Sequence, residues 1–182
     1  MKKDNRYQKT EAAILSSLLG IYRHEPYLAS LHPSRLAECS KISLATFYRH
    51  YKTVDDIFSF YEQKLTTKFK NMLKRRGKGN AKHALRLTLI FIYKHQEIFI
   101  ISFNRGDPRL LRQIFDQLRP KIEKSYNWPE ASDKLFDICF YEIYSLLHKW
   151  CQHAFSEQDS ARLLRDISYL LKSAKHRLKE II

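Results

Sequence analysis

The chain has 182 residues, 44% of them hydrophobic, which is enough apolar material for the core of one domain or two small ones. Its 33 Lys and Arg outnumber 19 Asp and Glu, and the formal net charge of +14 favours a polyanionic partner, nucleic acid before an anionic membrane surface. The 4 Gly and 5 Pro argue against β sandwiches and barrels and against Gly-rich nucleotide-binding loops.

The first third of the chain predicts three helices and the start of a fourth. Apolar residues recur at helical spacing over 8–24, and Pro26 follows the end of this helix. A second helix begins at Pro33, and a third follows Ser43, whose side chain is suited to cap it. Thr53 and Asp56 form a capping box before a long helix. The predicted inward-facing residues are Ile14, Leu18, Ile21, Tyr22, Leu36, Ala37, Ile57, Tyr61, Leu65, Phe69 and Leu73.

Beyond Gly77 and Gly79 the apolar spacing stays helical. The run 85–103 is interpreted as one bent helix or as two divided near His95, and a buried strand over 89–93 remains an alternative. Asp107 and Pro108 begin a helix to about residue 118. Two more helices are predicted, from Pro129 to about 155 and from 156–159 to about 179. The predicted fold is all-α, with a three-helix unit over 1–53, a connecting helix over 54–78 and a helical domain over 79–182.

The predicted helix over 129–155 is apolar all round between residues 135 and 150, so it must be covered on every side. It is either a central core helix or, with the last helix, part of an isologous two-fold interface. The second interpretation predicts a homodimer interface formed by Phe140, Tyr144, Leu147, Leu163, Ile167, Leu170, Leu171 and Ala174.

The segment 33–57 reads PSRLAECSKISLATFYRHYKTVDDI, which predicts a short helix, a tight turn and a second helix. This is the layout of a helix-turn-helix, whose second helix enters the major groove of DNA. Its order and spacing resemble the N-terminal signature of TetR-family transcriptional regulators, and the match is strongest over about residues 8–60. The positions that carry the resemblance are Leu36-Ala37, Ile42-Ser43, Thr46-Phe47-Tyr48, His50-Tyr51-Lys52 and Asp55-Asp56-Ile57.

The resemblance implies a homodimeric repressor on a palindromic operator of double-stranded DNA. A small-molecule effector would bind the variable helical second domain and release the DNA. The first residues of the recognition helix are expected at base edges, with Ala45 where the family often has glycine. Tyr48 and His50 match phosphate-contacting positions, whereas Phe47 and Tyr51 are expected in the core. The predicted DNA-binding residues are Ser34, Ser43, Leu44, Ala45, Thr46, Tyr48, Arg49, His50 and Lys52.

Three residues depart from the family pattern. Val54 replaces a lysine that contacts phosphate, and His32 replaces the Ser or Thr that caps the second helix. Lys41 stands where the turn usually has glycine, and a left-handed backbone there would cost a lysine about 1 kcal/mol.

The remaining candidates carry weaker signals. An effector pocket is expected among the middle helices, although aromatic residues there more often belong to a core. The spacing of His148, Cys151 and His153 lacks a fourth ligand, so neither a metal nor another cofactor is predicted. No catalytic constellation is present, so we do not expect an enzyme. The predicted effector-pocket residues are Phe91, Tyr93, His95, Phe99, Phe103 and Phe115.

The sequence also bears on the cellular location of the protein and on alternative functions. The 3 cysteines form no CxxC pair, and no segment approaches 18 uncharged apolar residues, so we expect a cytoplasmic protein with free thiols and no membrane span. Two alternatives stay open. One is a helix-turn-helix adaptor or constitutive DNA-binding protein whose second domain binds a protein. The other is a protein that binds a membrane surface through its basic face.

Overall fold

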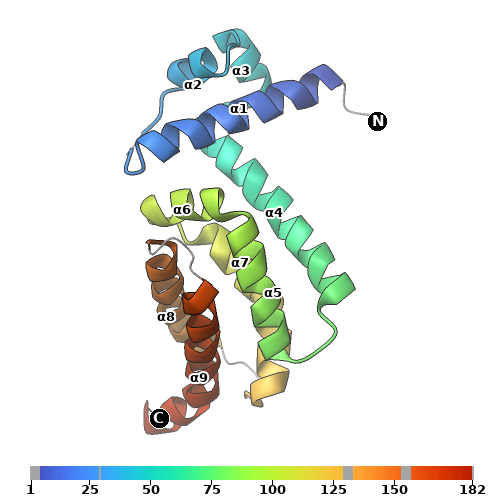
Figure 1. The fold of residues 1–182 in the computed structure, drawn as a ribbon, viewed down its shortest axis with the longest axis vertical. Helices are drawn as coiled ribbons and strands as arrows, with labels where there is room; N and C mark the ends of the chain where they lie inside the picture. The colour runs from blue at the N-terminus through green and yellow to red at the C-terminus, as the bar shows by residue number, and fades with distance from the viewer. Residues whose placement is uncertain (1–4, 29, 129–132, 153–156, 182) are drawn as a thin grey trace. The chain divides into compact units, whose positions relative to one another are not determined.

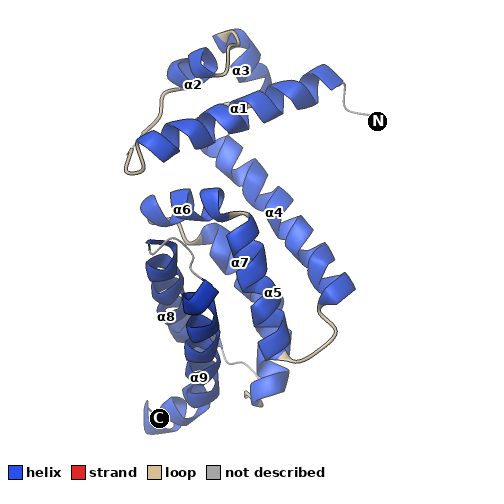
Figure 2. Cartoon of the chain, in the orientation of Figure 1, coloured by secondary structure: helices blue, strands red, loops and turns tan. Residues whose placement is uncertain are grey.

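A computed structural model describes residues 5–28, 30–128, 133–152 and 157–181 (Figure 1). All regular structure in these ranges is helical, which confirms the predicted all-α class (Figure 2). No helix in the described ranges is long and apolar enough to cross a bilayer. The helices are α1 (Asn5–His24), α2 (Pro33–Cys39), α3 (Leu44–His50), α4 (Val54–Arg76), α5 (Ala81–Lys94), α6 (Gln96–Asn104), α7 (Arg109–Tyr126), α8 (Asp133–Gln152) and α9 (Glu157–Ile181).

The chain forms two compact units. The first comprises residues 1–65 together with 104–106, and the second comprises residues 66–103 and 107–182. The division falls within α4 rather than at either end of it, because the two halves of this helix bury side chains in different cores: Ile57 in the first unit and Phe69 in the second. Gly77 and Gly79, which the sequence suggested as a boundary, lie in the segment between α4 and α5.

The core of the first unit follows the predicted helical faces. In α1, Ile14 and Leu18 are fully buried, and in α2 Leu36 is fully buried. Helix α1 packs on α2, and α2 packs on α3. Of the eleven predicted inward-facing residues of α1, α2 and α4, ten are buried and Leu73 is half-buried; Phe69 and Leu73 belong to the second unit.

In the second unit α5 packs on α7 and α9, and α8 and α9 lie side by side (Figure 1). The run 85–103 forms two helices that meet at His95, and residues 89–93 are helical. Helix α7 continues through Pro120 to Tyr126, past the predicted end at 118. Leu118 and Ile122 are fully buried on either side of the proline, so packing outweighs the one intrahelical hydrogen bond that proline cannot make. The predicted helix starts at 129 and 156 lie outside the described residues.

Candidate nucleic-acid interface

Helices α2 and α3 contain seven residues each and are joined by a turn over residues 40–43. The backbone N–H and the hydroxyl of Ser40 both donate to the carbonyl of Leu36, at 2.9 and 2.6 Å. Lys41 follows with φ of +54°, which confirms the expected left-handed backbone at this position. The N–H of Ile42 then donates to the carbonyl of Ala37 at 3.0 Å. These bonds give the chain a tight reversal of direction between the two helices.

The start of α3 is fixed by hydroxyl groups. Ser43 is its N-cap, as predicted, and its Oγ accepts the backbone N–H of Thr46 at 3.1 Å. The hydroxyls of Ser43 and Thr46 are hydrogen-bonded at 2.9 Å, and the guanidinium of Arg49 donates to Thr46 Oγ1 at the same distance. The three polar side chains are therefore linked along one edge of the helix.

Helix α3 has one buried face and one exposed face. Phe47 is fully buried and Tyr51, which follows the helix, is buried as well, as predicted for both. Burial raises the pKa of the Tyr51 phenol, so this group stays neutral at physiological pH. On the outer face Leu44 is 41% exposed and Tyr48 is 53% exposed. A seven-residue helix thus presents two large apolar or aromatic side chains to its surroundings.

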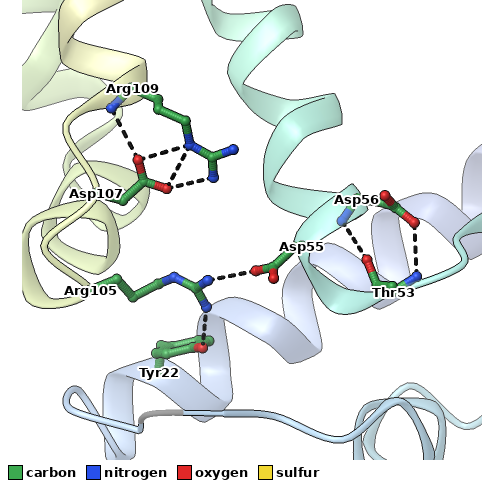
Figure 3. A network of polar contacts seen from close by, with 7 residues as sticks. All are labelled: Tyr22, Thr53, Asp55, Asp56, Arg105, Asp107 and Arg109. Atoms are coloured by element: carbon green, nitrogen blue, oxygen red, sulfur yellow. Dashed lines mark hydrogen bonds and ion pairs between the residues drawn. The ribbon is translucent and has the colours of Figure 1, made fainter.

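Hydrogen bonds also fix the backbone of residues 52–56, which follow α3. Asp56 Oδ2 accepts the backbone N–H of Thr53 at 2.8 Å, while the N–H of Asp56 donates to Thr53 Oγ1 at 3.2 Å (Figure 3). This is the predicted capping box. The same Oδ2 also accepts the backbone N–H of Lys52 at 2.9 Å. The side chain of Lys52 remains exposed. Val54 is buried, and His32 makes no capping hydrogen bond at the start of α2.

Two of the nine predicted DNA-binding residues are less accessible than the others. The ring of His50 is half-buried and stacks on the ring of Tyr7, with centroids 4.0 Å apart. Thr46 is half-buried within the hydroxyl chain described above. The other seven are exposed: Ser34, Ser43, Leu44, Ala45, Tyr48, Arg49 and Lys52.

Arg105 belongs to the first unit although it follows α6, and sequence analysis missed it. Its guanidinium donates to the phenol of Tyr22 at 2.9 Å and to the carboxylate of Asp55 at 2.6 Å (Figure 3). It also lies 4.3 Å from the ring centroid of Phe58. These contacts hold the first turn of α4 against the end of α1. No local pattern could have predicted them, because Asp55 and Arg105 are 50 residues apart.

The six predicted effector-pocket residues differ in their surroundings. Tyr93 is exposed and lines a groove described below, and the other five do not line that groove. Phe91 contacts His95, with ring centroids 4.7 Å apart, and burial together with two nearby lysines lowers the pKa of His95. Phe103 stacks on His148 and Phe115 packs on Phe140, while Phe99 is buried.

The eight residues predicted for a dimer interface lie mostly in the interior of the chain. Seven of the eight residues are buried within the chain itself, and Tyr144 is half-buried. They cover one another because α8 packs on α9. Among the described side chains of α8 and α9, Ile138, Tyr141 and Tyr169 are the large apolar ones that are exposed.

No group of three or more candidate metal ligands occurs among the described residues. His148 stacks on Phe103 and Cys151 is buried, while His153 lies outside the described residues. Comparison of the chain with models of known protein families, with curated proteins and with solved structures finds no match.

Proposed function

We propose that the chain is a sequence-specific DNA-binding transcriptional regulator, in which α2 and α3 form a helix-turn-helix. In its most specific form the proposal is a homodimeric repressor that leaves a palindromic operator when a small molecule binds the second unit. The observation that carries the proposal is the outer face of α3. This face exposes Leu44 and Tyr48 beside the cations Arg49 and Lys52, on a helix anchored from behind by Phe47.

Size and charge support this assignment. The major groove is about 12 Å wide and admits a single α-helix. The first unit, residues 1–65 and 104–106, carries 11 Lys and Arg against 7 Asp and Glu, so the unit that contains α3 has an excess of positive charge. Such an excess attracts the phosphate backbone whatever the base sequence, and the side chains at the start of α3 then supply sequence preference.

The contacts suggest a division of roles on α3. Leu44 and Ala45 have apolar side chains suited to a thymine methyl group, and the Tyr48 phenol reaches a phosphate. The Arg49 guanidinium donates to Thr46 Oγ1 at 2.9 Å in the free protein. On DNA it can exchange this neutral acceptor for a charged phosphate or a guanine edge. Lys52 contributes a phosphate contact only. Ser43 positions the helix through its cap rather than by touching DNA.

In this proposal, dimerisation supplies the sequence specificity of DNA binding. One recognition helix reads only a few base pairs, whereas two helices about 34–36 Å apart read both halves of a palindrome. The exposed Ile138, Tyr141 and Tyr169 are the proposed contact residues on α8 and α9, in place of the buried residues predicted from sequence. In this proposal Tyr141→Glu with Tyr169→Glu gives a monomer by light scattering, and an intact dimer would place the interface elsewhere.

The same exposed residues also suit the second candidate, a constitutive DNA-binding adaptor whose second unit binds another protein. The two candidates differ in the oligomeric state of the isolated chain. A dimer at micromolar concentration favours the repressor, and a monomer favours the adaptor.

The test is selection of genomic DNA fragments by the purified chain at about 150 mM salt, near physiological ionic strength. We expect one palindromic motif to be enriched and to be lost with Thr46→Ala plus Lys52→Ala. Lys124→Ala, which removes an exposed lysine at the end of α7, is the matched control and should keep the motif.

Single variants separate the two kinds of contact. Lys52→Ala should weaken binding to all sequences alike and reduce the salt slope by about 1, whereas Thr46→Ala should relax the motif by disturbing Arg49. Uniform weak binding without a motif would contradict the proposal.

A further inference from the structure

The second unit contains a groove with a volume of about 780 Å³. One wall is the outer face of α5, and the other is formed by the end of α8 and the start of α9, through Trp150, Ala161 and Leu164. A volume of this size lies within the range that accommodates small organic ligands. Of the six residues that the sequence suggested for an effector pocket, only Tyr93 lines this groove.

The groove is cationic at the beginning of α5. Lys82 and Arg86 are four residues apart, and so lie on one face of the helix, and both are exposed. Neither forms an ion pair with an acidic side chain in the described part of the chain, and no acidic side chain among the described ones lines the groove. His83 lies beside them. Lys82 and Arg86 therefore place two positive charges at this end of the groove.

Two backbone N–H groups in the first turn of α5 already have partners. The N–H of Ala81 donates to Ser125 Oγ at 2.9 Å, and that of His83 donates to Asn80 Oδ1 at 3.1 Å. An anion in the groove would therefore be held by the side chains of Lys82 and Arg86 rather than by the N–H groups of the first turn. The positive end of the helix dipole adds to their attraction.

The groove becomes apolar toward the end of α5. Ile90 and Tyr93 continue the face that begins with Lys82 and Arg86, and each is 52% exposed. Leu164 faces them from the opposite wall. From Lys82 to Tyr93 the helix rises by roughly 16 Å, so charge at one end and apolar surface at the other are separated by the length of a medium-sized molecule.

We propose that this groove binds an amphipathic organic anion. Its carboxylate or phosphate head pairs with Lys82 and Arg86, and its hydrocarbon chain or ring lies along Ile90, Tyr93 and Leu164. The planar guanidinium of Arg86 can donate two parallel hydrogen bonds to the anionic head group, and the ammonium of Lys82 supplies a compact positive charge. All of these residues belong to the second unit, so this binding does not depend on whether α3 binds DNA.

Isothermal titration calorimetry of the full chain without DNA tests the proposal. The probes are octanoate and octyl phosphate, with octanol as the uncharged analogue. We expect saturable binding of at least one anion at one site. Lys82→Gln with Arg86→Gln should raise its Kd about tenfold and leave the weaker binding of octanol unchanged, because a charge-assisted hydrogen bond contributes to the anion only.

Two further variants complete the design. Lys94→Gln removes an exposed lysine of α5 outside the groove and should leave every Kd unchanged. Ile90→Ser should weaken the binding of both anions and of octanol to a similar extent. Circular dichroism verifies that each variant folds. Absence of saturable binding across the soluble range of both anions would overturn the proposal, as would equal effects of Lys94→Gln and the double variant.

Discussion

Replacing Lys41 by glycine should stabilise the first unit. Lys41 is exposed and has φ of +54°, a left-handed conformation that costs a residue with a side chain about 1–2 kcal/mol. Glycine avoids this cost but loses about 0.5–1 kcal/mol more conformational entropy on folding. The N–H of residue 41 keeps its 2.9 Å bond to the carbonyl of Glu38. The expected net gain is about 0.5–1 kcal/mol in the free energy of unfolding.

Urea unfolding followed by circular dichroism measures this gain. Lys41→Ala is the control for charge, because it removes the same positive charge from a chain of net charge +14 but keeps the Cβ that causes the strain. Asn127→Gly is the control for backbone, because Asn127 also has a left-handed φ, of +51°, which asparagine tolerates well. Both control variants should raise the free energy of unfolding by less than Lys41→Gly does. If Lys41→Ala stabilises as much, the charge rather than the backbone is responsible.

Three further measurements test other parts of the structure. A double-mutant cycle of Arg105→Gln and Asp55→Asn should give a coupling of only about 0.5–1 kcal/mol, because the Asp55 side chain is 69% exposed; a zero coupling would mean that the bond is absent in solution. Because the pKa of His95 is lowered in the folded chain, the unfolded chain binds a proton at His95 at a higher pH than the folded chain does. Stability is therefore complete above about pH 6.5 and falls below it by up to about 1.4 kcal/mol per pH unit, and His95→Gln should reduce this fall in urea titrations; an unchanged pH profile would refute the assignment. Cys39 is the exposed thiol, whereas the other two are buried and burial raises the pKa of Cys151 to about 12. A thiol reagent should label one cysteine rapidly in the folded chain and none in Cys39→Ser, and rapid labelling of two would contradict the burial of Cys151.

The sequence predicted those features that depend on neighbours along the chain. The Ser43 cap, the Thr53–Asp56 box and the buried faces of α1 and α4 each follow from residues within a few turns of one another. The left-handed backbone of Lys41 was suggested by the resemblance to TetR-family regulators, in which the turn usually has glycine at this position, and not by local spacing. Apart from this position, local spacing accounts for most of the first unit.

The features that sequence reasoning missed depend on distant contacts. Pro120 lies inside α7 because Leu118 and Ile122 are buried against other helices, which a local rule cannot weigh. Aromatic residues such as Phe99 and Phe115 look the same in a core and in a pocket until their neighbours are known. The apolar residues of α8 required a cover, and sequence alone does not distinguish a cover supplied by α9 from one supplied by a second chain.

The first unit is discontinuous along the chain, and this has a consequence for its synthesis. Residues 1–65 leave the ribosome well before Arg105, which belongs to the same unit. Until then the Asp55 carboxylate and the Tyr22 phenol lack the guanidinium that joins them, and its arrival must close a loop of 50 residues. The α2–α3 pair can therefore form early during translation, whereas the junction of α1 with α4 is completed only after α5 and α6 have been made.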